Sequence, residues 1–431
     1  MNVSLVMAAV LTMAAAGAYA QTQPLTSTPS GDARRLTLAE TIRLAEDADV
    51  ALRSKRAELY GAQGALTEAS SLLFNNPEAS VDTVRRTVPQ PAQPDGRWRE
   101  WHGGLSQTIE IAGQQGHRHA AAAATLDARR AEIEEARRSA RTEAAMQFYR
   151  LVAQQERLRL DDHAMHLFEL SASAVQKRKA AGEDTRLDAN VATVEAERAR
   201  NQSAVSLEQL ADAQADLAAR LQLPPGVKVE ADGQLSAPVA SWTRQEVLAE
   251  AATLPRLRAF AAREDAAAER LKLEQAGVYP DVTVGVSVGR EGSPDARERM
   301  TTVSMSLPLP LFKRNDAGIG QARTELEQVR AERQAATRDA QAQVAVLWAK
   351  LESLKARVDR LRVSVLPALQ ENEALSAKSQ KAGQISPLEL IVVNRQALDA
   401  QRDLIDAQLE LQLTRLALEA ASGWNDERSA Q

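Results

Sequence analysis

Residues 282–289 read Val-Thr-Val-Gly-Val-Ser-Val-Gly, and residues 302–309 read Thr-Val-Ser-Met-Ser-Leu-Pro-Leu. In both stretches every second residue is apolar, and most residues between them are small or polar. A period of two places the two kinds of side chain on opposite faces of a β-strand. One apolar and one small polar face is the pattern of transmembrane barrel strands. Two further strands with weaker alternation are expected around 78–86 and 105–111.

The loops within each strand pair, 87–97 and 290–299, are rich in Pro, Gly and charged residues. Trp98 and Trp101 flank the first loop, and the opposite strand ends carry Phe74, Tyr279 and Phe312. Two belts of rings would fit the interfacial girdles of membrane-spanning strands. Ordinary packing at the sheet edges is the alternative.

Outside these strands the sequence is typical of long helices. Ala, Glu, Gln, Arg and Leu dominate, and aromatic residues make up only 3%, which is few for the core of a globular enzyme. The stretches 114–181 and 316–382 would each form a helix about 100 Å long. Pro367 should kink the second helix or open its hydrogen bonding. Steps of three and four join the apolar residues Leu347, Leu351, Leu354, Val358, Leu361 and Val365, which predicts a heptad seam.

The final helix carries two interleaved seven-residue repeats. They are Ile391, Leu398 and Ile405, and Leu404, Leu411 and Leu418. Two such repeats predict two buried faces, so this helix should have neighbours on both sides.

The chain contains an internal duplication. Landmarks recur at offsets of 201, 203 and 200 residues: Gly182 with Gly383, Asn76 with Tyr279, and Ile109 with Leu309. Each repeat is expected to hold a helical segment (36–74, then 243–277), two strands and two long helices. The predicted division is a signal peptide at 1–20, an N-terminal extension at 21–35, a first repeat at 36–222, a linker at 223–242, a second repeat at 243–421 and a tail at 422–431.

The signal peptide prediction rests on the apolar run 3–20, which ends in Ala18-Tyr19-Ala20 although no Lys or Arg precedes it. No later stretch is long and apolar enough for a transmembrane helix. The absence of cysteine excludes disulfides, thiolate metal sites and an acylated N-terminal cysteine.

The charge distribution and the absence of certain motifs argue against several other functional classes of protein. The net charge of -5 comes from interspersed signs without a basic stripe, so nucleic acid is not an expected partner. There is no nucleophile elbow, phosphate-binding glycine loop or metal-ligand quartet, so neither an enzyme nor a cofactor is expected. His163 and His166 have acceptable ligand spacing, and His117 and His119 do not in a helix. Solvent-facing roles are favoured for all four, and no metal site is predicted.

Four strands cannot close a barrel, because about eight is the smallest closed membrane form. Open strand edges cannot lie in lipid, because each unpaired backbone group costs several kcal/mol. If the strands lie in a membrane, several copies of the chain must share one barrel.

The duplicated helix–strand–strand–helix–helix plan resembles the TolC family of outer-membrane efflux ducts over essentially the whole mature chain. The junctions 106–114 (Ser-Gln-Thr-Ile-Glu-Ile-Ala-Gly-Gln) and 307–315 (Leu-Pro-Leu-Pro-Leu-Phe-Lys-Arg-Asn) are similar to those of its CzcC-like heavy-metal-efflux subgroup. The resemblance implies a mainly α fold with a small β part. Long coiled-coil helices and four transmembrane strands per chain would form a homotrimeric 12-stranded barrel and a periplasmic tunnel.

The resemblance also implies a location and partners. The chain would lie in the outer membrane of a Gram-negative bacterium, in contact with its lipid and with a large periplasmic part. It would assemble with a periplasmic adaptor and an inner-membrane resistance–nodulation–division pump. Ducts of this family are passive and catalyse nothing.

Two glycine turns should form the periplasmic end of the tunnel. By resemblance the residues expected to contact the adaptor are Gly182, Glu183, Asp184, Thr185, Gly383, Gln384, Ile385 and Ser386. Asp188 and Glu389 should cap the helices that begin at Thr185 and Ser386. In the family an acidic ring follows the second glycine and constricts the tunnel. The expected gate is therefore Glu389, with Val392 where a second acid is sometimes found, and Asp188 in the first repeat.

The leading hypothesis is a passive outer-membrane duct that exports heavy-metal cations. The alternatives are a multidrug-efflux or type I secretion duct of the same family, and a soluble periplasmic coiled-coil scaffold. The scaffold would leave four apolar strand faces exposed to water.

Overall fold

The computed structural model describes residues 34–89, 94–236, 242–382 and 384–423. The predicted signal peptide 1–20, Gly383 and nearly all of the extension 21–35 and the tail 422–431 lie outside these residues. No helix among the described residues is long and apolar enough to cross a membrane.

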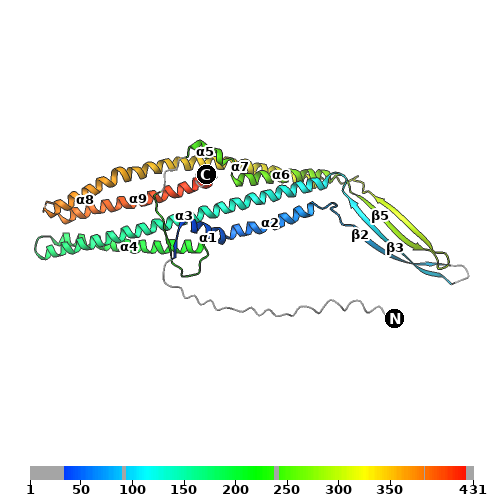
Figure 1. Cartoon of the computed structure of the whole chain (residues 1–431), viewed down its shortest axis with the longest axis horizontal. Helices are drawn as coiled ribbons and strands as arrows, with labels where there is room; N and C mark the ends of the chain where they lie inside the picture. Colours follow the sequence, from blue (N-terminus) through cyan, green and yellow to red (C-terminus); the bar gives the residue numbers. More distant parts are fainter. Residues whose placement is uncertain (1–33, 90–93, 237–241, 383, 424–431) are drawn as a thin grey trace.

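The molecule is a long rod with helices along most of its length and a sheet at one end (Figure 1). The elements of the first half are β1 (Arg34–Leu36), α1 (Leu38–Ala48), α2 (Val50–Ala69), β2 (Glu78–Val88), β3 (Gly96–Ile109), α3 (Gln114–Ala180) and α4 (Arg186–Arg220). Those that follow are β4 (Val229–Ala231), α5 (Arg244–Ala251), α6 (Pro255–Ala276), β5 (Val282–Glu291), β6 (Glu298–Ser306), α7 (Asp316–Arg360), η1 (Leu361–Val365), α8 (Leu366–Lys381) and α9 (Pro387–Ser422). The division of the chain into two repeats stays a prediction.

The main sheet is antiparallel, with strand order β2-β3-β5-β6. The β3–β5 pair joins strands far apart in the sequence, with Trp101 opposite Arg290 and Ile109 opposite Val282. β2 and β6 form its two open edges within the described part of the chain. A second, parallel pair of short strands, β1 and β4, joins Arg34–Leu36 to Val229–Ala231.

The predicted strand ends were partly wrong. β2 pairs along its full length with β3, from Glu78 opposite Ser106 to Val88 opposite Gly96, so the predicted loop 87–97 is shorter than expected. The predicted loop 290–299 is shortened in the same way by β5 and β6. β6 ends at Ser306 rather than at 309, because Pro308 has no backbone N–H to donate to a neighbouring strand.

The two shorter helical segments are each broken. Asp49 separates α1 from α2, and its carboxylate accepts a hydrogen bond of 2.7 Å from the backbone nitrogen of Leu52. Pro255 begins α6, where its missing N–H costs nothing, and this separates α6 from α5. The helical segments expected over 36–74 and 243–277 therefore each consist of two helices.

The two long helical stretches are confirmed. α3 has 67 residues and is about 100 Å long. In the other stretch the helix continues through η1, a π-helical turn just before Pro367. The backbone N–H of Leu366 donates to the carbonyl of Leu361, a bond that spans five residues instead of four. The expected disturbance at this proline is confirmed.

The heptad seam of α7 is buried at Leu351, Leu354 and Val358 but does not continue through η1. Val365 is exposed, so its predicted place in the seam is wrong. The extra residue of the π turn rotates the following side chains around the helix axis.

α9 packs against helices on both sides, as its two repeats predicted. Ile391 and Leu398 join a core with α3 and α4. Leu418 and the half-buried Leu411 join another with α5 and α7. The final helix therefore ties the two halves of the rod together.

Candidate functional site

Two turns that each connect a pair of helices, α3 to α4 and α8 to α9, lie at the end of the rod opposite the sheet (Figure 1). At the first turn, α3 stops where Gly182 adopts a φ of +80°. The backbone N–H of Glu183 donates to the carbonyl of Arg178 at 2.9 Å, and that of Gly182 to the carbonyl of Lys179 at 3.0 Å. This pair of bonds satisfies the last carbonyls of the helix and favours glycine at the left-handed residue.

α4 begins at a full capping box. The backbone nitrogen of Thr185 donates to Oδ2 of Asp188 at 3.0 Å, and the backbone nitrogen of Asp188 donates to Oγ1 of Thr185 at 3.1 Å. Hydrogen bonds from the Thr185 side chain and backbone hold the pKa of Asp188 below its usual value. The expected capping role of Asp188 is confirmed.

The second turn has the same construction. The backbone nitrogen of Ser386 donates to Oε2 of Glu389 at 2.8 Å, and that of Glu389 donates to Oγ of Ser386 at 3.3 Å. Pro387 occupies the first turn of α9. The N–H of Gln384 donates to the carbonyl of Ser379 at 2.8 Å, the counterpart of the Glu183 bond. The capping role of Glu389 is confirmed, whereas Gly383 lies outside the described residues.

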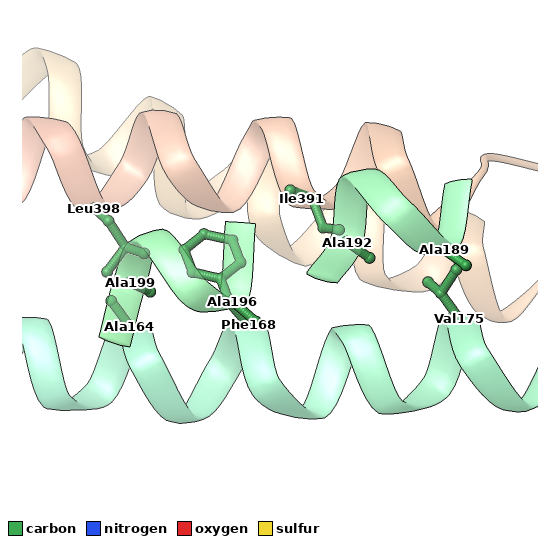
Figure 2. Close-up of a cluster of buried hydrophobic side chains, with 9 residues drawn as sticks. All are labelled: Ala164, Phe168, Val175, Ala189, Ala192, Ala196, Ala199, Ile391 and Leu398. Carbon is green, nitrogen blue, oxygen red and sulfur yellow. The ribbon is translucent and has the colours of Figure 1, made fainter. Parts of the chain in front are cut away.

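Small side chains hold the helices behind the two turns together (Figure 2). The buried cluster consists of Ala164, Phe168, Val175, Ala189, Ala192, Ala196, Ala199, Ile391 and Leu398. Four alanines on α4 allow its backbone to approach α3 and α9 closely. The positions of both capping boxes are therefore set by a shared core.

Charged pairs add to this core. Arg178 Nε lies 3.0 Å from Oδ2 of Asp184, whose side chain is only 8% exposed, so Asp184 helps to hold the first turn against α3. Glu195 of α4 accepts from Arg198 at 3.1 Å and lies 3.6 Å from Arg395 of α9.

The predicted gate residues do not all come together. Glu389 and Val392 share an exposed face of α9, because they are three residues apart, and Val392 is 51% exposed. Asp188 lies on the other turn, and among the described residues no hydrogen bond or ion pair joins it to Glu389. Glu183, Thr185, Gln384 and Ser386 are exposed, and Ile385 is half-buried.

The sequence reading missed an apolar stripe on α4 beside the first turn. Leu187, Val191 and Val194 are 69%, 37% and 50% exposed. They follow one another in steps of four and three, so they share one helix face that this chain leaves uncovered. The same spacing was readable in the sequence.

The histidines occupy ordinary polar sites. His117 Nδ1 lies 2.8 Å from Glu269, and His166 lies 3.8 Å from Glu169. No group of three or more metal-binding side chains is found over the described ranges.

The sheet carries most of its large apolar side chains on one face. Directly opposed residues of antiparallel strands share a face, so the register assigns every side chain to one of two faces. The first face, called here the apolar face, exposes Val81, Trp101, Leu105, Val284, Val286, Val288, Val303 and Met305. The other face, called the polar face, carries Ser80, Gly104, Ser106, Gly285, Ser287, Thr302 and Ser304.

The strand register places Trp98 on the polar face together with Glu100, and Nε1 of Trp98 donates to Oε1 of Glu100 at 2.8 Å. Its expected place beside Trp101 in one belt of rings is therefore wrong. Alternation along β3 separates Trp98 from Trp101, which are three residues apart.

Comparison with known proteins agrees with this architecture. The sequence model of a family described as outer membrane efflux protein matches residues 246–424. The cobalt-zinc-cadmium resistance protein CzcC of Cupriavidus metallidurans is 26% identical over 388 residues, which cover 88% of this chain and 87% of that protein.

Solved structures share the fold. The outer-membrane channel OprN superposes with a TM-score of 0.75 at 17% identity, over 90% of each chain. CusC gives 0.73 at 16% identity, over 90% of this chain and 92% of that one. VceC of Vibrio cholerae gives 0.73 at 20% identity, over 90% of this chain and 96% of that one.

The structure and the comparisons agree with one another. The chain is a rod of paired helices with capped turns at one end and a four-stranded sheet at the other, and its second half matches the family model. Residues 246–424 belong to the outer membrane efflux protein family, and the described chain has the fold of its TolC-type channels of the Gram-negative outer membrane.

Proposed function

We propose that this chain is the outer-membrane duct of an efflux system that exports heavy-metal cations. The family is one of channels rather than enzymes, so the duct would be passive. The cargo assignment is supported by the similarity to CzcC, whose name describes cobalt, zinc and cadmium resistance. The exposed carboxylate of Glu389 gives the helix tips a group that attracts cations.

The observation that carries the duct proposal is the exposed apolar face of a sheet with two open edges, β2 and β6. Lipid would satisfy the apolar side chains but not the backbone groups of those edges. Three copies that pair β6 of one chain with β2 of the next would form a closed barrel of about twelve strands. The helices of the three chains would continue this barrel as a periplasmic tunnel, with two structural repeats per chain.

At the far end of the tunnel, Glu389 would form an acidic ring, and Val392 an apolar one on the same face of α9. Asp188 would contribute from the α3–α4 turn. The exposed residues of both turns would contact a periplasmic adaptor, which connects the duct to an inner-membrane resistance–nodulation–division pump. Their exposure in the single chain leaves them accessible to such a partner.

The test is a tolerance panel on a strain deleted for this gene, complemented with the wild-type chain. We expect selective sensitivity to zinc, cobalt, cadmium or another metal cation, and its reversal on complementation. Sensitivity only to dyes, detergents or antibiotics would support a duct whose cargo is organic compounds instead of metal cations. Failure of protein secretion would indicate a type I secretion duct. A chain recovered as a soluble periplasmic monomer would overturn the duct itself.

A further inference from the structure

The apolar face of the sheet ends in a cluster of arginines at the end away from the helices. From the row that contains Trp101 onward, that face carries no large apolar side chain other than Trp101 itself. Instead it carries Arg85, Arg97, Arg99, Arg290 and Arg299, here called the arginine rim. All five side chains are exposed.

The strand register places these arginines directly against one another. Arg85 lies opposite Arg99, and Arg290 lies opposite Arg299. Like charges in directly opposed pairs destabilise an isolated sheet. Two such pairs on one face therefore indicate that a group outside this chain compensates the charge.

The acidic side chains of the strands at this end of the sheet lie on the polar face, and two of them are already engaged. Glu100 accepts from Trp98 and from the backbone nitrogen of Gly292 at 3.0 Å, and its carboxylate lies 3.2 Å from Arg86. Glu291 lies 3.2 Å from His102 on the same face. Within the described residues no ion pair joins an acidic group to the arginine rim, so its guanidinium groups face outward without a carboxylate.

The rim is also hollowed. A cavity of about 440 Å³ is lined by Arg85, Thr87, Arg97, Trp98 and Arg99. Guanidinium groups around a hollow of this size present many N–H donors in the fork geometry that fits phosphate oxygens.

The distance along the strands places the rim at the outer surface of the membrane. Ile109 and Trp101 both lie in β3, eight residues and so about 27 Å apart. At the strand tilt of about 40° found in outer-membrane barrels, that length corresponds to about 21 Å along the membrane normal, close to the apolar band of about 25 Å. If the helix end of the sheet faces the periplasm, then Trp101 lies at the outer interface and the rim at the depth of the outer-leaflet headgroups.

We propose that the arginine rim binds the phosphate groups of a phosphorylated glycolipid in the outer leaflet of the outer membrane. The apolar face below it would pack against the acyl chains of the same lipid, and Trp101 would lie at the boundary between the two regions. This proposal rests on the membrane insertion of the sheet put forward above. It adds a lipid-binding site on the outside of the duct, remote from the path of the cargo.

The test uses the full-length chain purified in a mild detergent. Lipid A, which carries two phosphates, is titrated into the protein, and bound lipid is counted by native mass spectrometry. The same titration is repeated with dephosphorylated lipid A, and with lipid A in the presence of inorganic phosphate. A triple variant, Arg85→Gln with Arg97→Gln and Arg99→Gln, is compared with a charge-matched control on α7, Arg323→Gln with Arg338→Gln and Arg357→Gln.

We expect the wild type and the α7 control to bind lipid A, and the rim variant to bind it about tenfold more weakly or worse. Removal of the phosphates from the lipid should weaken binding to the wild type by a similar factor. Equal binding by the wild type and the rim variant would overturn the proposal, and so would displacement by millimolar inorganic phosphate, which would indicate a simple anion site.

A separate measurement keeps this test distinct from the test of the duct. Reconstitution of the wild type into bilayers without phosphorylated glycolipid reports whether the sheet inserts at all. Insertion together with phosphate-independent lipid binding would overturn only the rim proposal. Failure to insert would overturn the duct and the rim together.

Discussion

Arg402 of α9 donates through Nε to Oδ1 of Asp161 on α3 at 2.8 Å, and its Nη2 lies 2.7 Å from the same oxygen. The Asp161 side chain is fully buried, and its other oxygen accepts from Ser206 of α4. One carboxylate therefore joins three helices, including α3 and α9, which are far apart in the sequence. The arrangement fixes how the final helix lies against the first half of the rod.

Asp161→Asn should destabilise the helical rod by about 3 kcal/mol, because it removes the buried counter-charge of Arg402 and leaves only the exposed Asp399 beside it. The measurement is chemical denaturation of the detergent-solubilised chain, followed by circular dichroism. Arg130→Gln, which breaks an exposed pair with Asp127 on α3, should change stability by less than about 1 kcal/mol. Similar losses in the two variants would show that Asp161 does not join the helices.

A second polar junction, centred on Glu132, should respond to pH. Its side chain is 10% exposed and contacts Lys55 of α2, Arg129 of α3 and Arg263 of α6. Burial alone would raise the pKa of Glu132, but hydrogen bonds from Arg129 and Arg263 outweigh burial and hold that pKa below 4.5.

Because the pKa of Glu132 is depressed on folding, its contribution to stability is present above pH 4.5 and is lost as the pH falls through the folded value. Glu132→Gln should therefore cost about 1–2 kcal/mol at pH 7 and progressively less in acid. Denaturation curves between pH 7 and pH 3 measure this difference. A cost that does not vary with pH, or an equal cost for the exposed Glu134→Gln, would contradict the assignment.

The cap of α9 should control local order at the second turn. Ser386→Ala removes the acceptor for the backbone nitrogen of Glu389 and should cost about 1 kcal/mol. Hydrogen exchange of the first amides of α9 should accelerate correspondingly. The control is Ser173→Ala on the exposed surface of α3, where alanine is the better helix former. Unchanged exchange in the Ser386 variant would mean that packing alone holds this turn.

Glu389→Gln separates the two roles of that residue, because glutamine keeps the capping box and removes the charge. If Glu389 lines the tunnel, the variant should lower the preference of the channel for cations over anions by about threefold. Reversal potentials in a salt gradient measure the preference. The control Glu371→Gln removes an exposed charge from α8. Equal selectivity of the Glu389 variant and the wild type would place the carboxylate outside the tunnel.

Much of the rod could be predicted from local pattern. The period-two alternation at 282–289 became β5, the two repeats of the last helix became two buried faces, and Pro367 follows a π turn. These features depend on residues close together in the sequence. Both capping boxes were likewise visible as Thr185-x-x-Asp188 and Ser386-x-x-Glu389.

The features that the sequence reading missed depend on long-range contacts. The alternation of β3 is interrupted by Gly103 and Gly104, so its extension to Gly96 follows from pairing with β2 and not from a pattern of its own. The pairing of β3 with β5 connects residues nearly two hundred positions apart. Only this register shows that Arg85, Arg99 and Arg290 share the apolar face with Trp101.

The central claim is that copies of this chain form a channel through the outer membrane. Single-channel recording of the purified full-length chain in a planar lipid bilayer tests it directly. The account predicts stepwise insertion events, each followed by a steady ion current that needs no nucleotide or other energy source. A folded, detergent-purified chain that never conducts, at any voltage and over many trials, would contradict the account.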